Sequence, residues 1–451
     1  MLTVTASIIA LLWTTPPVVS HPSMTVLSAS EANVFLIPDS AANTAEMRVV
    51  IYSGSADDPT GKEGVAWLAA RTMRREAAQH SAALAANLRL AVGKDQMVFS
   101  VASTGETLVG TLDAIETMLL KPSFDSAAIS AEVEEQKTAI DSALKDPAKV
   151  AAEAFDGFVY RGHPYGHPVM GRLSSIAALS RDDLVAFYAA HWRKGNVAVG
   201  LSGNVAEPIA ARLKADLAAL TDGQPVRPAR PLRWLARPRV VVVQTGAGVA
   251  LKIGHALNVA RAHPDYLALK VAQAELEDAG EGIEHVDATI EDYDPPDTAR
   301  GEPGLGRRQQ SFTMTASPGA DSVSVVRRCL SRMTNLVAGV PEAGSWLEPA
   351  RQRAESRGSY PAGGSSLEMA GVLDEFLSRT PGFSGRFVAG LQAVNADILK
   401  SALARVLFPA HVAIIAVVPD AKAFIDGMLA PPDGGLTRDD FEQVAPESLF
   451  R

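Results

Sequence analysis

Cysteine is nearly absent from this sequence, in which Cys329 is the only one among 451 residues. No disulfide can therefore form within the chain, and a metal site built from several thiolates is excluded. Long hydrophobic runs are missing too, because no stretch reaches the ~20 apolar residues that a membrane-spanning helix needs. Basic residues are outnumbered by acidic ones, 42 against 51, which gives a formal net charge of −9. This acidity argues against a nucleic-acid partner, since phosphate binding needs a basic surface.

The composition that remains is typical of a folded globular protein, with 47% hydrophobic and 21% charged residues. The length predicts two or more domains of roughly 100 to 200 residues each.

Residues 1–23 have some features of a secretory signal peptide. A short apolar core from Val4 to Trp13 is followed by prolines and then by the small residues that precede a cleavage point. No Lys or Arg precedes this core, so two locations stay open: the periplasm or another exported location, and the cytoplasm.

Hydrophobic periodicity divides the chain into two similar parts. The first, residues 24–220, alternates predicted strands with helices expected at about 62–78, 108–119 and 126–144, where Pro122 and Pro147 end the helical patterns. Residues 221–239 are rich in proline and arginine, which predicts an extended linker. Residues 240–430 begin and end with strands and helices like those of the first part, which indicates a tandem duplication. Residues 431–451 are interpreted as a polar tail.

The most informative stretch is the glycine-flanked helix start at residues 61–71. Around it, several short elements form a recognisable set: Gly54 through Gly64, Ala66, Lys121 to Phe124, His163 to Gly166, Gly171, the Ser180 to Leu184 helix cap, and Gly203. This set resembles the pitrilysin or insulinase-type metallopeptidases (family M16), which are relatives of mitochondrial processing peptidase. The resemblance implies an α+β fold: two homologous α/β domains with antiparallel-rich sheets and packed helices, joined by the linker and forming half of a clamshell.

The family's inverted zinc motif, H-x-x-E-H, falls on residues that cannot perform its chemistry. The first histidine position is Trp67, the glutamate is Ala70 and the second histidine is Arg71. Tryptophan offers only an N–H donor, and arginine places a permanent cation where the metal ion would lie. The third zinc ligand of the family, a glutamate, falls on Ala139. We therefore expect no catalytic residue, no bound metal and no other cofactor.

Nearby acidic residues leave one question open at this site. Glu132 and Glu135 lie seven and four residues before position 139, so both would share its helix face. A shift of register would restore a carboxylate there, although not the histidines.

Candidate substrate contacts lie in the second half. The family pattern R-x-x-x-G-L-x-Y fits Arg300 to Arg307, with Arg307 in place of the tyrosine, so Arg300 and Arg307 are the predicted peptide-binding residues. Arg353 and Tyr360 have a similar spacing but fall where the family has a packed helix. His163 and His167 are interpreted as parts of a structural loop, and His255 and His263 as surface or internally satisfied histidines; none of the four is interpreted as a metal ligand.

The resemblance implies a non-catalytic subunit that pairs with a zinc-bearing homologue and helps to form a peptide-binding chamber. A stand-alone homodimeric scaffold or peptide-binding module is the alternative. An active peptidase with an unrecognised site is a third interpretation.

Overall fold

The structure of the chain is a computed structural model. The structure describes residues 25–26, 33–80, 82–223, 232, 234–246, 248–277, 286–290, 293–294, 305–306, 309–317, 321–339, 345–358, 365–378, 380, 382–431 and 435–451. The predicted signal peptide and most of the proline-rich linker lie outside these residues. Within the described residues, no helix is both long and apolar enough to cross a membrane.

The first half forms a six-stranded sheet in the order β1-β2-β6-β3-β5-β4. Its strands are β1 (Thr25–Val26), β2 (Asn33–Pro38), β3 (Thr44–Ile51), β4 (Arg89–Val92), β5 (Met97–Thr104) and β6 (Val197–Gly203). The β2–β6 pair is parallel, and the other pairs are antiparallel. One face is covered by α1 (Val65–His80), α3 (Leu108–Leu120), α7 (Arg181–His191) and α8 (Glu207–Leu217), whose buried side chains share one core with the sheet.

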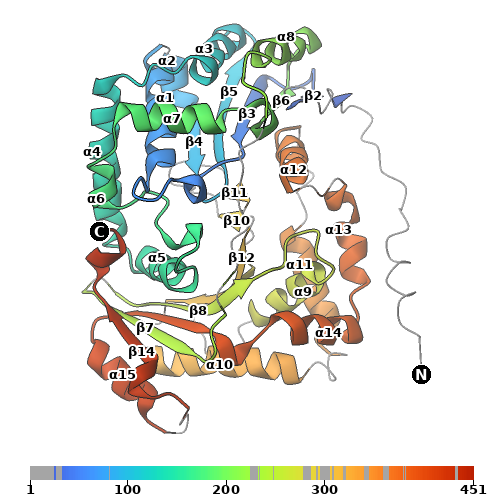
Figure 1. The fold of residues 1–451 in the computed structure, drawn as a ribbon. Coiled ribbons are helices and arrows are strands. Elements are labelled where there is room, and N and C mark those ends of the chain that lie inside the picture. Colours follow the sequence, from blue (N-terminus) through green and yellow to red (C-terminus); the bar gives the residue numbers. More distant parts are fainter. Residues whose placement is uncertain are drawn as a thin grey trace, which may run out of the picture.

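The second half repeats this arrangement in the order β14-β7-β13-β8-β12-β9. Its strands are β7 (Arg239–Gln244), β8 (Ala250–Leu257), β9 (Val286–Ile290), β12 (Gln310–Ala316), β13 (Ala413–Val418) and β14 (Phe441–Val444). The helices that share its core are α9 (Tyr266–Glu277), α10 (Ser322–Ala338), α11 (Leu347–Gly358), α13 (Phe383–Gln392), α14 (Ala396–Val406) and α15 (Ala421–Leu429). Figure 1 shows the two units one above the other.

Five strands of each sheet share one topology, and the remaining edge strands differ, because β1 is antiparallel to β2 whereas β14 is parallel to β7. In each, a parallel pair (β2–β6 or β7–β13) continues through three antiparallel neighbours: β3, β5 and β4 in the first sheet, and β8, β12 and β9 in the second. This correspondence confirms the predicted fold class of two similar α/β units with antiparallel-rich sheets.

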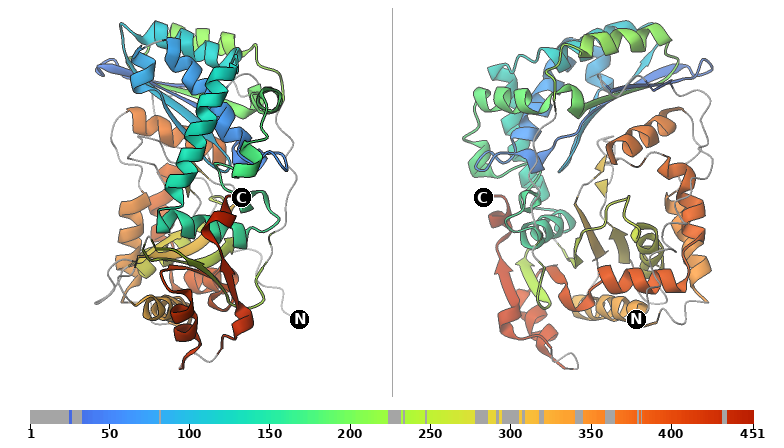
Figure 2. Two further views of the ribbon diagram at one scale, coloured as in Figure 1. Left: turned by 90° about the vertical axis from the view of Figure 1, so that its left-hand side faces the viewer. Right: turned by 45° about the vertical axis from the view of Figure 1, so that its right-hand side comes forward.

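Each unit contributes a helix to the other unit's sheet. Helix α5 (Pro147–Val159), from the first half of the sequence, packs its Phe155 and Val150 against strands β7, β8 and β13. Helix α12 (Ser365–Ser378), from the second half, packs Met369 and Leu373 against β2 and β6. Both helices lie between the two sheets in Figure 2. This exchange joins the units through buried apolar surface as well as through the linker.

The remaining elements are short or lie at the edges. They are α2 (Ala82–Asn87), α4 (Ser126–Ala143), α6 (Leu173–Ile176), the pair β10 (Tyr293–Asp294) and β11 (Leu305–Gly306), and the 3₁₀ turns η2 (Ser55–Asp57), η3 (Pro164–Gly166), η4 (Lys194–Asn196), η6 (Pro409–His411), η7 (Arg438–Asp440) and η8 (Pro446–Leu449).

The structure corrects two expectations. Pro147 ends no helix but begins α5, where its missing N–H costs nothing and the Asp146 carboxylate accepts the N–H groups of Ala148 and Lys149. The expected polar tail is largely folded, because β14 pairs with β7 and Phe450 is fully buried against Ile140.

Candidate functional site

Helix α1 begins at a tightly held turn. The Asp58 carboxylate accepts hydrogen bonds from the N–H groups of Gly64 (2.7 Å) and Ala66 (2.9 Å), and burial raises the pKa of this carboxyl well above its ordinary value. Gly64 has φ of +97°, and a Cβ there would lie 2.8 Å from the Met170 carbonyl oxygen. A Cβ on Gly171 would lie 2.2 Å from the Glu63 carbonyl oxygen, so the loop before α6 fixes the start of α1.

A groove lies between α1 and α4, and we refer to it as the α1/α4 groove. It has a volume of about 440 Å³ and is lined by Trp67, Arg71, Arg74, Arg89, Leu90, Glu135, Thr138, Ala139 and Ser142. The residues on each helix are spaced three or four apart, so each helix contributes a single stripe to the wall. The start of strand β4 supplies Arg89 and Leu90.

The groove brings together three of the four family positions. Trp67, Arg71 and Ala139 all line it, whereas Ala70 is fully buried on the core-facing side of α1. Glu135 lines the groove beside Ala139, but Glu132 faces α1.

Glu132 is held by two arginines of α1. Its side chain is only 2% exposed, and its oxygens lie 3.3 Å from Arg71 Nε and 2.7 Å from Arg75 Nε. The Arg71 guanidinium also lies over the Trp67 ring, 5.4 Å from its centre. This carboxylate therefore neutralises part of the charge of Arg71 and Arg75.

These residues do not fit a zinc ion. Trp67 and Ala139 provide no lone pair for a metal, and Arg71 is cationic at every physiological pH. Among the described residues, no group of three or more His, Cys, Asp or Glu side chains is placed to hold a metal ion.

The predicted substrate-binding residues Arg300 and Arg307 lie outside the described residues, as does Tyr360. Arg353 lies on α11, where it donates to the Ala274 carbonyl oxygen and pairs with Glu275 at 2.8 Å, a packing role as expected.

The loop around His163 and His167 is structural. His163 Nδ1 accepts the N–H of Tyr165, and burial lowers the pKa of His167 to about 4. Lys94, which is 1% exposed, donates to the carbonyl oxygens of Tyr165 (2.9 Å) and His167 (2.5 Å). Nothing in the sequence pattern singled out Lys94, because its partners, these two carbonyl oxygens and the Asp156 carboxylate at 3.5 Å, lie far away in the sequence.

The same loop fastens the two units together. The Tyr160 hydroxyl donates to the Gln310 carbonyl oxygen at 3.0 Å, and the Gln309 N–H donates to the Tyr165 hydroxyl at 3.1 Å. The histidine- and tyrosine-containing loop thus positions the second sheet relative to α1.

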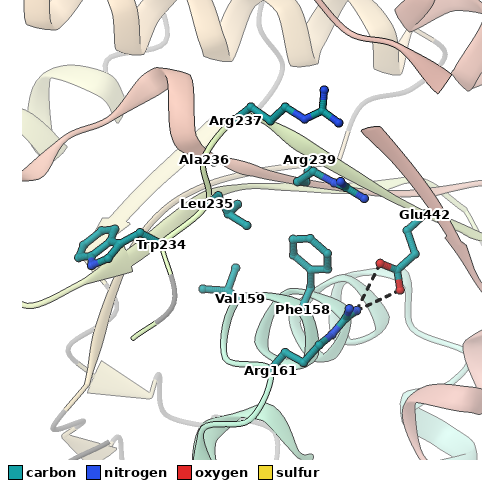
Figure 3. Close-up of a pocket in the computed structure, with 9 residues that line it drawn as sticks. All are labelled: Phe158, Val159, Arg161, Trp234, Leu235, Ala236, Arg237, Arg239 and Glu442. Carbon is teal, nitrogen blue, oxygen red and sulfur yellow. Dashed lines mark hydrogen bonds and ion pairs between the residues drawn. The ribbon is translucent and has the colours of Figure 1, made fainter. Parts of the chain in front are cut away.

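A second pocket, of about 360 Å³, lies where α5 meets the end of the linker and β14. Figure 3 shows Arg161 reaching across it to Glu442, with a nitrogen–oxygen distance of 3.0 Å. Trp234, which is 52% exposed, lies at its margin. Because its ionic contact joins the turn after α5 to β14, this pocket belongs to the junction between the units.

Comparison with known proteins points to one family. The family model for insulinase (peptidase family M16) matches residues 33–172. A curated protein of Rickettsia bellii, described as an uncharacterized zinc protease, is 22% identical over 192 residues, which are 40% of this chain and 46% of that protein.

Solved structures establish the fold. An inactive M16 peptidase domain from Pseudomonas fluorescens is 18% identical, with a TM-score of 0.75 over 88% of this chain and 98% of that domain. Pitrilysin is 14% identical, with a TM-score of 0.68 over 91% of this chain and 48% of pitrilysin. This chain therefore has the fold of about half of pitrilysin.

Proposed function

We propose that the chain is a non-catalytic member of the insulinase family, peptidase family M16, and that it pairs as a subunit with a zinc-bearing homologue. In this role it forms part of the wall of a peptide-binding chamber. The observation that carries the proposal is the α1/α4 groove. It remains open at the family's metal position but is lined by Trp67, Arg71 and Ala139.

The half-clamshell fold supports the pairing. Pitrilysin is about twice as long as the region this chain matches, so a second unit of similar size would complete the same enclosure. A chain that loses its metal ligands keeps the surfaces used for association and for peptide contact.

The sheet edge beside the groove supports peptide binding. Strand β4 is the last strand of the first sheet, and its Arg89 and Leu90 line the groove. An extended peptide can add to such an edge through backbone hydrogen bonds while its side chains enter neighbouring pockets.

Affinity purification of the full chain from its native cells tests the pairing. We expect a protein that contains H-x-x-E-H to co-purify at equal stoichiometry. We also expect its hydrolysis of an unstructured peptide to rise when the two purified chains are mixed.

A homodimer without such a partner, together with unchanged partner activity on mixing, would contradict the proposal and favour the stand-alone scaffold. Zinc bound stoichiometrically by the isolated, metal-clean chain, with peptide hydrolysis, would contradict both and indicate an active peptidase.

A further inference from the structure

We propose that the pocket at the junction of the two units binds a carboxylate carried on an apolar group, and that Arg239 receives the carboxylate. We call it the junction pocket, and Arg161, Trp234, Arg239 and Glu442 are among the residues that line it. Its volume of about 360 Å³ lies within the range of ~300–1,000 Å³ that is typical of small-molecule sites. It shares no lining residue with the α1/α4 groove, so this inference does not depend on the proposed pairing or on its peptide chamber.

Strand geometry brings Arg239 to the pocket. Arg239 is the first residue of β7, and side chains along a strand alternate between its two faces, so Arg239 shares a face with Val241 and Val243. Both valines are buried against Phe155 and Val159 of α5. The Arg239 side chain therefore extends from the end of an apolar face, where it is half-buried.

Arg239 differs from the other two arginines of the pocket in its contacts. Arg161 Nη2 lies 3.0 and 3.3 Å from the two carboxylate oxygens of Glu442. Arg237 Nε lies 2.9 Å from an oxygen of Asp440. The Arg239 guanidinium has no hydrogen-bond or ion-pair partner in the part of the chain that the structure describes. Figure 3 shows it extending toward the side of the pocket where Glu442 lies. Its donors are therefore available to a ligand.

The charges at this place favour a ligand with one negative charge. Three guanidinium groups meet two carboxylates, Glu442 and Asp440, so one positive charge remains. The Thr437 N–H, and then Arg237 and Arg239, hold the pKa of Asp440 below its ordinary value, so this carboxylate stays charged. A carboxylate balances the remaining charge and matches the planar fork of a guanidinium. A phosphate dianion would exceed that charge.

The opposite side of the pocket is apolar. Trp234 is 52% exposed, and Figure 3 shows it across the pocket from Glu442. Its ring lies 5.9 Å from the ring of Phe408, which supports one edge, while Leu235 and Phe158 line the pocket beside it. Large exposed aromatic side chains of this kind are enriched at binding sites. The ligand therefore has an apolar group at one end and a carboxylate at the other.

Ligand binding here should stabilise the junction between the units. Phe158 and Arg161 come from the end of α5 and the turn after it, in the first half of the sequence, whereas Arg239 and Glu442 belong to β7 and β14 of the second sheet. A ligand that contacts both sets binds only when the two units are assembled. It should therefore raise the thermal midpoint of the chain.

Isothermal titration calorimetry of the full chain tests the proposal with two matched pairs of probes. The first pair is N-acetyl-phenylalanine and its amide, which carry the same apolar group and differ in the negative charge. The second pair is a hexapeptide that ends in phenylalanine, with a free or an amidated C-terminus. A preference for the carboxylate in the first pair alone identifies a free small carboxylate as the ligand, and a preference in the second pair identifies a peptide C-terminus.

We expect the carboxylate member of at least one pair to bind about tenfold more tightly than its amide, because a charge-assisted hydrogen bond replaces a neutral one. At about 100 times its Kd, that ligand should raise the thermal midpoint by roughly 2–4 °C.

Two variants separate the roles of the two ends of the pocket. We expect Arg239→Gln to remove most of the preference for the carboxylate. Trp234→Ala should weaken both members of a pair by a similar factor, about threefold to tenfold, and leave the preference in place, because it removes apolar contact and no charge. Arg48→Gln is the matched control, since Arg48 is a half-buried arginine on β3 of the first sheet and does not line the pocket.

Thermal denaturation verifies that each variant folds. If Arg239→Gln does not fold, Arg239→Lys takes its place, and an intermediate preference is expected because the charge remains without the planar fork. Equal affinities within both pairs, or no binding of any probe to the native chain, would overturn the proposal. A preference that is unchanged in the folded Arg239 variant would also overturn it, because the carboxylate would then be held elsewhere.

Discussion

Each family position in the α1/α4 groove meets a different requirement of a zinc site. Two histidines separated by four residues on one helix supply two ligands, and a carboxylate from another helix supplies the third. In this chain the predicted ligand positions are Trp67, Arg71 and Ala139, and all three line one groove. The predicted positions therefore lie together, although their side chains cannot bind zinc.

Restoring the motif tests whether this geometry suffices. We expect Trp67→His, Ala70→Glu and Arg71→His together to lack tight zinc binding, because only two histidine ligands are added. Adding Ala139→Glu should give tight binding, since a catalytic zinc needs three protein ligands. Competition with a chelating dye measures the affinity. Tight binding by the triple variant alone would show that a carboxylate already faces the site, with Glu135 the residue that lines it.

Glu132 offers a test of the ion pairs beneath the groove. We expect Glu132→Gln to lower the free energy of unfolding by about 1–3 kcal/mol, because Arg71 and Arg75 lose their shared carboxylate but remain partly solvated. Denaturant titration measures the change. Glu134→Gln on the same helix is the control: Glu134 is 73% exposed, so its pair with Lys137 should contribute less than about 1 kcal/mol. Equal effects of the two variants would contradict the structural role of Glu132.

His255 gives the fold a predictable dependence on pH. Its Nδ1 lies 2.9 Å from the Ala256 carbonyl oxygen, and its Nε2 accepts the Phe408 N–H at 3.3 Å, a pattern that suits the neutral ring. Burial lowers the pKa of His255 from 6.5 to about 4. Between these values the unfolded chain binds a proton that the folded chain does not bind, so stability falls as the pH falls.

We expect this histidine to account for a loss of up to about 3 kcal/mol between pH 6.5 and 4. The measurement is the difference in unfolding free energy between the native chain and His255→Gln across this range. The difference should narrow or reverse as the pH falls, since the glutamine variant does not take up the proton. Parallel pH profiles would show that His255 does not titrate in this way.

At the level of helices and strands, the sequence predicts the helices whose ends are set by neighbouring residues. The Ser180 cap of α7 and its partner Asp183 form the expected reciprocal hydrogen bonds, and α3 and α4 lie close to their predicted bounds. Helix α5 was missed because proline disfavours the interior of a helix but suits its first turn, and only the cap at Asp146 distinguishes the two.

Contacts between distant segments were not predictable in the same way. The spacing of the motif located Trp67 and Arg71, and the family's third ligand position located Ala139. Arg74 lies on the same stripe of α1 and was available from helical spacing. Arg89 could not be assigned to the groove from the sequence, because its place there depends on how β4 packs against α1.

The exchange of helices between the units predicts that a substitution in the first half of the sequence destabilises the second sheet. Phe155 lies on α5 in the first half of the sequence but is fully buried against the second sheet. We expect Phe155→Ala to lower stability by about 3–5 kcal/mol through the cavity it leaves. Hydrogen exchange should show lost protection first in β8 and β13. Phe187→Ala, in the core of the first unit, is the control and should affect the first sheet instead. The same exchange pattern in both variants would contradict this assignment.

At the scale of the whole molecule, the two units are joined at several places. Helices α5 and α12 cross between the sheets, and the Tyr160 and Tyr165 hydroxyls bond to the backbone of the second half. The duplication was visible in the order of strands and helices along the chain. The sequence did not show that α5 and α12 cross between the units, because a helix has the same apolar periodicity whichever sheet it covers.

The segment after β14 makes a further connection. Phe450 is fully buried with Ile140 and Ile176, and its carbonyl oxygen accepts the Leu173 N–H at 2.7 Å. Strand β14, a few residues earlier, belongs to the second sheet. A chain segment expected to be a polar tail therefore ties the second sheet to helix α4, which forms one wall of the α1/α4 groove.

We expect Phe450→Ala to lower the free energy of unfolding by about 3–5 kcal/mol, because a large aromatic side chain is removed from a closed site. The effect should also reach the groove, since α4 rests on Phe450 through Ile140. Hydrogen exchange should increase in α4 as well as in β14. Glu447→Ala, an exposed neighbour, is the control and should leave both unchanged. Faster exchange confined to β14 would show that this contact does not couple the second sheet to the groove.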